Sequence, residues 1–240
     1  MSELQSDLLE YSANRASLYE LLGSLYLLEL TAPQVDRFRH QDFDLLKGVD
    51  PHIDEGLASI KRYFKASAGS DARTELATDY AHSVLGATAD ERRMALPYES
   101  VFTSEEGLLM QSARDDVYRL YCAEHLGTPE GLDIPEDHLG LMFEFMAHLC
   151  RRYNDALLAG DLCEAHRLAC VQQEMLVNHI ANWIDEYCDV LADVSRTDFY
   201  KGLSQITRGW VKLEVPTVAG VIADTEDVSA LFRTEPRPAV

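Results

Sequence analysis

The sequence predicts an all-α fold, a helical bundle of roughly nine to eleven helices. Apolar residues recur at three- and four-residue spacing along most of the chain, as expected for helices that each bury one face. Glycine and proline are sparse, at 13 and 8 of 240 residues, which argues against an all-β fold rich in tight turns. The 47% of hydrophobic and 26% of charged residues are typical of a globular protein with a sizeable core.

The first part of the chain contains four predicted helices, at 4–30, 33–39, 50–67 and 71–85. Residues 86–103 lack a helical period and contain Gly86 and Pro97, so a loop is expected there. Thr103 with Glu106 three residues later is a capping-box signature. It predicts a further helix that ends at about residue 126.

A connector rich in glycine and proline follows, with Gly127, Pro129, Gly131 and Pro135. Beyond it, helices are predicted at 136–159, 162–181, 183–192 and 197–212. Residues 214–240 carry three prolines and no clear period, which predicts a C-terminal tail. One domain is therefore expected, with an N-terminal helical subdomain (1–127), a hinge and C-terminal helical subdomain (128–213) and the tail.

The net charge of −20 indicates which partners the chain avoids, because an acidic protein repels nucleic acid backbones and anionic membrane surfaces. The acidic N-terminus has no apolar segment typical of a secretory signal, and no run of apolar residues is long enough to span a membrane. The five cysteines include no CxxC pair, which favours reduced thiols. We expect a cytoplasmic protein with no nucleic acid partner and no integral membrane segment.

The most informative segment is 134–146, where Pro135 and Glu136 suit the first turn of a helix. Asp137 and His138 follow at the same end. Behind them the helical spacing of a buried face is carried by Leu139, Met142, Phe143 and Met146. The two polar side chains would be held at the rigid end of a core helix, where they can serve a site. The alternative is an N-terminal charge beside a half-exposed histidine.

Basic residues are missing from two stretches. No lysine or arginine lies between Arg119 and Arg151, and none lies in 95–113. The acids in these stretches are Glu99, Glu105, Glu106, Glu124, Glu130, Asp133, Glu136, Asp137 and Glu144. Because carboxylates bind arginine, and soft side chains such as Met142 and Phe145 accept apolar segments, a peptide-binding groove is predicted. The alternative is a solvated acidic loop over a core.

Two other kinds of chemistry compete with peptide binding. Cys163, His166 and Cys170 share one helix face and would supply part of a zinc site, but no second ligand pair has suitable spacing. His138 with Asp137 would be an acid–base pair, but adjacent helical residues diverge by about 100° and no motif marks a nucleophile. We therefore expect no metal, no cofactor and no catalytic residue.

At these residues the sequence resembles the TorD/DmsD family of redox enzyme maturation chaperones, to which the NarJ-type nitrate reductase assembly chaperones are related. Its central signature is similar to Glu136-Asp137-His138-Leu139-Gly140, and its proline–aromatic–x–Ser loop to Pro97-Tyr98-Glu99-Ser100-Val101-Phe102. Leu108-Leu109-Met110-Gln111 also reads like the family. A late element of histidine and tryptophan matches His179-Ile180-Ala181-Asn182-Trp183. The resemblance covers about residues 10–210.

The resemblance implies two helical subdomains around a hinge and binding to the twin-arginine leader of a molybdopterin oxidoreductase. The chaperone would hold the apo catalytic subunit until its cofactor is loaded and then release it for export. The residues implied in peptide binding are Pro97, Tyr98, Ser100, Phe102, Glu136, Asp137 and His138. A monomer or a domain-swapped dimer is expected. Weak guanine nucleotide binding is associated with the family, but this chain has no phosphate-loop motif.

In the mechanism that we expect, Glu136 and Asp137 attract the arginine pair of the leader through charge-assisted hydrogen bonds. The apolar part of the leader lies against Tyr98, Phe102 and Met142 or Phe145. Protonation of His138 tunes the site. One alternative is a relative that acts on a non-exported enzyme and binds a segment without twin arginines. A helical enzyme that uses His138 and a metal-binding helical protein are the others.

Overall fold

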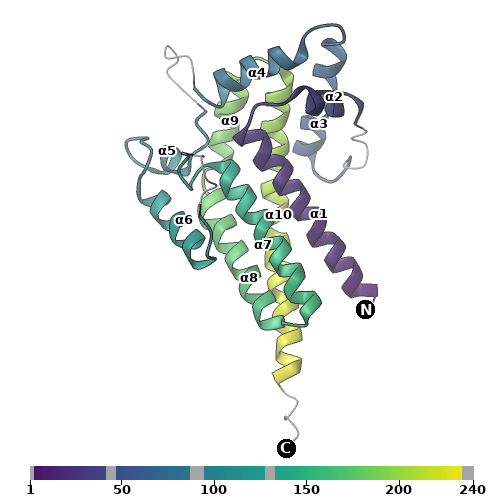
Figure 1. Cartoon of the computed structure of the whole chain (residues 1–240), viewed down its shortest axis with the longest axis vertical. Helices are drawn as coiled ribbons and strands as arrows, with labels where there is room; N and C mark the ends of the chain where they lie inside the picture. Colours follow the sequence, from purple (N-terminus) through teal and green to yellow (C-terminus); the bar gives the residue numbers. More distant parts are fainter. Residues whose placement is uncertain (1–2, 42–46, 87–94, 128–132, 234–240) are drawn as a thin grey trace, which may run out of the picture.

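The computed structural model describes residues 3–41, 47–86, 95–127 and 133–233, and it confirms the all-α fold. The helices, in chain order, are α1 (Glu3–Leu27), α2 (Ala32–His40), α3 (Pro51–Ala66), α4 (Ala72–Ser83), α5 (Glu99–Thr103), α6 (Ser112–Ala123), α7 (Leu139–Ala159), α8 (Leu162–Glu174), the π-helical turn η2 (Met175–Ile180), α9 (Ile184–Val194) and α10 (Asp198–Arg233). Figure 1 shows their arrangement. Among the described helices, none is both long enough and apolar enough to cross a membrane.

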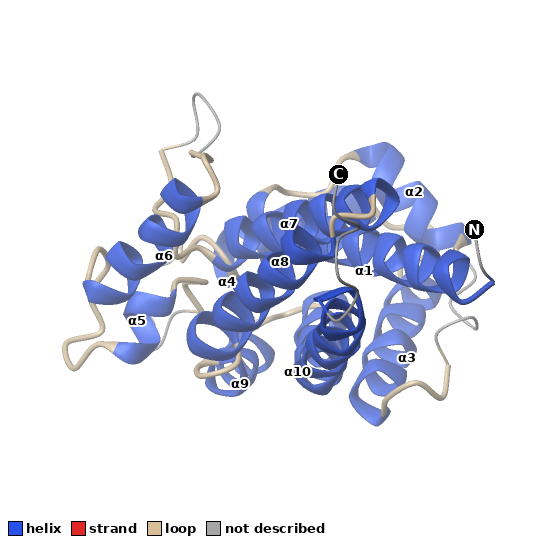
Figure 2. Cartoon of the chain, turned by 90° about the horizontal axis from the view of Figure 1, so that it is seen from below, coloured by secondary structure: helices blue, strands red, loops and turns tan. Residues whose placement is uncertain are grey.

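The body of the molecule is built around two long helix contacts. α1 packs along α7, and α10 packs against α3, α8 and α9 (Figures 1 and 2). One hydrophobic core includes Tyr19 of α1, Phe143 of α7 and Leu203 of α10. Because this core draws on both sides of the expected boundary at residue 127, the two halves are packed together. The division into subdomains stays a prediction.

Glycine lets the helices approach where α7 begins. A Cβ placed on Gly140 would lie 3.0 Å from the carbonyl oxygen of Gly23 and 2.6 Å from a side-chain carbon of Leu27. Such distances are shorter than ordinary carbon contacts, so only glycine permits this crossing of α1 and α7. The first turn of α7, next to Asp137 and His138, is thereby held against the core.

Two helices with an N-terminal cap, α3 and α4, lie close to where the sequence predicts them. α3 and α4 differ from their expected ranges by one or two residues at each end. The Asp50 carboxylate accepts hydrogen bonds from the backbone N–H groups at the start of α3, and the Asp71 carboxylate does the same for α4. Local sequence signals therefore determine these boundaries.

Two expectations for 86–126 are wrong. The C-terminal part of the predicted loop, from Glu99 to Thr103, forms the short helix α5. Thr103 opens no helix, since α6 begins only at Ser112. The residues between them turn through a left-handed conformation at Gly107 and at Met110, with φ of 63° and 61°, and this geometry cannot continue a helix.

The predicted C-terminal tail is also wrong in its described part, because α10 continues from Asp198 to Arg233 instead of ending near residue 212. Glu214 and Val218 are buried on the same face of this helix. The side chain of Pro216 lies on the exposed face, so the ring interrupts the helical bonding without entering the core. Residues 234–240 lie outside the described part of the chain.

Candidate functional site

The two segments singled out by the sequence meet in the structure. Backbone hydrogen bonds join Leu139 N–H to the carbonyl of Pro97 at 2.7 Å and Glu99 N–H to the carbonyl of Asp137 at 3.1 Å. They form an isolated antiparallel bridge between Tyr98 and His138. The start of α5 is thus joined directly to the start of α7.

Asp137 is fully buried and serves as a cap for α5 from outside that helix. Its Oδ2 accepts a hydrogen bond from Ser100 N–H at 2.9 Å and another from the Ser100 hydroxyl. Unpaired N–H groups at a helix start favour a carboxylate, so this contact stabilises both the charge and the short helix. Oδ1 is buried with no hydrogen-bond partner among the described residues.

His138 ends the turn before α7 and is its N-cap residue, so the helix begins at Leu139 and not at residue 136 as expected. The backbone N–H of Gly140 donates to His138 Nδ1 at 3.0 Å, which places the proton of the neutral ring on Nε2. The ring meets that of Tyr98 edge to face, with centroids 4.9 Å apart. Burial lowers the pKa of His138 from 6.5 to about 4, so the ring is uncharged at neutral pH.

Glu136 is buried and neutralised by an arginine that is distant in sequence. Arg114 Nε donates to its Oε2 at 2.7 Å, and the guanidinium lies 4.7 Å from the ring centre of Tyr118. Glu124, also buried, pairs in the same way with Arg152 and Arg167. The lack of basic residues between Arg119 and Arg151 in the sequence therefore does not leave these two acids without a positive partner in the fold.

A second buried contact ties α5 to η2 and α9. The Glu99 carboxylate lies 3.0 Å from His179 Nδ1 and accepts a hydrogen bond from the Asn182 amide at 3.2 Å. The ring of Phe102 stacks on Trp183 with centroids 5.3 Å apart. The loop at residue 97 and the histidine–tryptophan element at 179–183 thus form one cluster. The sequence identified Glu99 only as an acid in a predicted loop. Nothing in the neighbouring sequence indicated that it contacts His179, 80 residues further along the chain.

A cleft of about 570 Å3 opens beside this cluster. One wall comes from α5 and α6, and the other comes from the end of α8 and from η2. Its lining residues are Glu99, Thr103, Ser112, Ala113, Asp116, Arg119, Leu120, Glu174, Asn178 and His179. Its three carboxylates outnumber its one arginine, although Asp116 is paired with that arginine and Glu99 is held by His179. The cleft therefore suits a cationic or hydrogen-bonding group.

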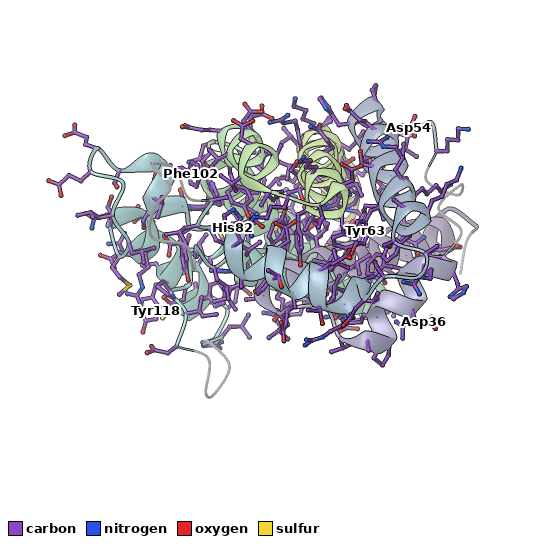
Figure 3. The ribbon with its side chains drawn as sticks, turned by 90° about the horizontal axis from the view of Figure 1, so that it is seen from above. Asp36, Asp54, Tyr63, His82, Phe102 and Tyr118 are labelled. Carbon is purple, nitrogen blue, oxygen red and sulfur yellow. The ribbon has the colours of Figure 1, made fainter. Side chains whose placement is uncertain are left out.

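The sequence-predicted residues differ in their distance from solvent. Pro97, Ser100, Glu136, Asp137 and His138 are buried, whereas Tyr98 and Phe102 are partly exposed. Figure 3 shows Phe102 and Tyr118 at one end of the molecule and Asp36 and Asp54 at the other. The structure thus brings the predicted residues together, and the five buried ones form a joint between the starts of α5 and α7. None of the seven is among the residues that line the cleft.

Two of the three candidate zinc ligands, His166 and Cys170, contact each other, and His166 also contacts α10. The Nδ1 of His166 lies 3.1 Å from the Thr225 hydroxyl, and its Nε2 lies 3.6 Å from Cys170 Sγ. Among the described residues, no group of three or more His, Cys, Asp or Glu side chains is arranged to hold a metal ion. Nothing in this geometry favours the metal-binding alternative over a packed helix face.

Comparison with known proteins places these features in a wider context. The sequence profile of the nitrate reductase delta subunit family matches residues 47–189. The chaperone protein TorD of Vibrio atlanticus is 25% identical, over 88% of this chain and 97% of its own. The chaperone protein TorD of Aliivibrio fischeri is 23% identical, over 90% and 99%. That of Shewanella oneidensis is 28% identical, over 82% and 87%.

Proposed function

The chain belongs to the nitrate reductase delta subunit family, and from this premise we propose that it binds the twin-arginine leader and the apo form of a molybdopterin-containing oxidoreductase subunit. At the coarser level, it is a chaperone of redox enzyme maturation and not an enzyme. In the proposed cycle it holds the apo subunit in the cytoplasm, supports cofactor insertion and delays export. The match to TorD chaperones along most of both chains carries this proposal.

The chemistry of the cleft supports a ligand with arginines. Charge-assisted hydrogen bonds between carboxylate and guanidinium are about twice as strong as neutral ones, and their paired geometry selects arginine over lysine. Asp116 on α6 and Glu174 at the end of α8 supply carboxylates on both walls. Their combined charge would favour a leader that carries two adjacent arginines.

We assign the buried residues a positioning role in this function. Ser100, Asp137 and His138 hold α5 against the start of α7, and Pro97 and Tyr98 complete the bridge. A leader that touched the Asp137 carboxylate directly would have to displace Ser100 from it. We therefore propose that the leader binds at the surface above this joint. A monomer and a domain-swapped dimer both stay predictions.

Capture of the chain from its host tests the proposal. A tagged copy at its natural level is purified, and the bound proteins are identified by mass spectrometry. The expected partner is a molybdopterin oxidoreductase subunit that still carries its leader and lacks its cofactor. A bound oxidoreductase subunit without any leader would favour the non-exported client instead. If no oxidoreductase subunit is recovered, the proposal is refuted.

A further inference from the structure

Three large apolar side chains stand exposed in a row on the loop between α5 and α6. Leu108, Leu109 and Met110 are exposed to 51%, 41% and 58% of their surface. α5, α6 and this loop project from one side of the bundle (Figures 1 and 2). A run of exposed apolar residues contributes nothing to the core and favours aggregation, so it is typical of an interaction surface.

The loop has a defined conformation that presents these side chains. Leu108 N–H donates to the Ser104 hydroxyl at 3.2 Å, and the Gln111 side chain donates to the carbonyl of Leu109 at 2.9 Å. Gln111 N–H donates to the Ser100 hydroxyl at 3.3 Å. Because the same hydroxyl donates to Asp137, the buried joint is connected to the apolar loop by two consecutive hydrogen bonds.

Acidic groups surround the apolar loop. Glu105 and Glu106 precede it and are exposed. Ser112, two residues after Met110, already lines the acidic cleft. An apolar surface therefore continues directly into a cleft whose carboxylates outnumber its arginines. This combination complements a peptide in which a pair of arginines precedes an apolar segment.

We propose that Leu108, Leu109 and Met110, together with the acidic cleft, are the docking surface for the leader of the client. The apolar segment of the leader lies on the loop, and its arginines face Asp116 and Glu174 in the cleft. This inference rests on the proposed function and locates its binding surface. It differs from the expectation that Phe102 receives the apolar segment, because that ring is stacked on Trp183.

Calorimetric titration with the leader peptide of the captured client tests this surface. We compare the wild type, the double variant Leu109→Ser/Met110→Ser and the control Leu28→Ser/Leu158→Ser. The control removes two apolar side chains that are at least as exposed, one directly after α1 and one on α7. The loop variant is expected to bind about tenfold more weakly, and the control is expected to bind like the wild type. Asp116→Asn/Glu174→Gln should weaken binding of the arginine leader more than that of a lysine version. Circular dichroism is used to check that each variant keeps the helicity of the wild type.

The possible results distinguish a wrong docking surface from a wrong function. If the wild type and the loop variant bind the leader equally, the surface is wrong while the function stands. If the wild type binds no leader, the function fails and the surface fails with it. Analytical sedimentation tests the other possible occupant of the apolar loop, a second copy of this chain. A wild-type dimer that the loop variant converts to monomer without loss of leader binding would overturn the inference.

Discussion

Among single residues, Asp137 has the clearest structural role, because its carboxylate holds the first turn of α5. Replacing it by alanine leaves the Ser100 N–H and hydroxyl without this acceptor in a buried place. We expect Asp137→Ala to lower the free energy of unfolding by about 2–3 kcal/mol, measured by urea denaturation. Asp137→Asn, which keeps one acceptor oxygen, should lose less. An alanine variant as stable as the wild type would show that the contact does not stabilise the fold.

Asp137 is also expected to affect leader binding indirectly, because it supports the loop between α5 and α6. Asp137→Asn should weaken leader binding several-fold while leaving helicity intact, because the Ser100 hydroxyl links it to Gln111. The measurement is a calorimetric titration of both proteins with one leader peptide. Unchanged affinity would exclude any role of Asp137 in binding, direct or indirect.

The buried His138 is expected to make the stability of the fold depend on pH. Burial lowers its pKa from 6.5 to about 4, so the unfolded chain binds a proton that the folded chain does not between these two values. Stability from this group is complete above pH 6.5 and is lost as the pH falls towards 4. The loss amounts to about 3 kcal/mol.

The variant His138→Asn isolates this contribution, because asparagine keeps an acceptor for Gly140 N–H but does not titrate. Urea denaturation between pH 4 and 7 should give a shallower pH dependence for the variant than for the wild type. Parallel curves for the two proteins would mean that His138 is protonated in the folded state as readily as in the unfolded chain.

Among the helices, those that begin at a local N-terminal cap were the most predictable. α2, α3 and α4 lie within two residues of their expected ranges because period and caps act over neighbouring residues. α5 was missed because its N-terminal cap, Asp137, comes from 37 residues further along the chain. The cap pair of Thr103 and Glu106 was misleading because the turn at Gly107 prevents a helix there.

The C-terminal extension of α10 brings Glu214 into the core, although the sequence predicted this residue in a tail. Its contribution to stability can be tested. Arg15 donates to both carboxylate oxygens of Glu214, with distances of 2.7–3.0 Å, and the pair is almost fully buried. Glu214→Gln leaves a buried guanidinium without its opposing charge. We expect a loss of about 3 kcal/mol in the free energy of unfolding, measured by denaturant titration.

A surface pair provides the matched control. Glu29 pairs with Arg73 at 2.7 Å, but both side chains are about half exposed. Glu29→Gln should therefore cost less than about 1 kcal/mol. Equal effects of the two substitutions would mean that burial adds nothing to the contribution of the Arg15–Glu214 pair.

For the molecule as a whole, composition predicted the fold class but not how the charges are used. The net charge of −20 coexists with arginines that neutralise acids inside the bundle, as Arg114 does for Glu136. These pairs join segments that are separated in the sequence, so spacing along the chain does not reveal them.

The sequence predicted which segments form the candidate site, but not how their side chains are buried and paired. The sequence identified the segments around Tyr98 and His138, and the structure joins them. It did not predict that Asp137 and His138 are buried, because burial depends on α5 folding back over the start of α7. It also gave no sign of the contact between Glu99 and His179, which forms only when η2 packs beside α5.

The central claim is that this chain recognises the arginine pair of a leader, and calorimetric titration tests it most directly. The purified chain is titrated with leader peptides of the molybdopterin oxidoreductases of its host, each paired with a version in which both arginines are lysines. We predict saturable binding of one leader with a dissociation constant of about micromolar order, weakened by about tenfold in the lysine version. Absence of binding by every leader, or equal affinity for the arginine and lysine versions, would contradict it.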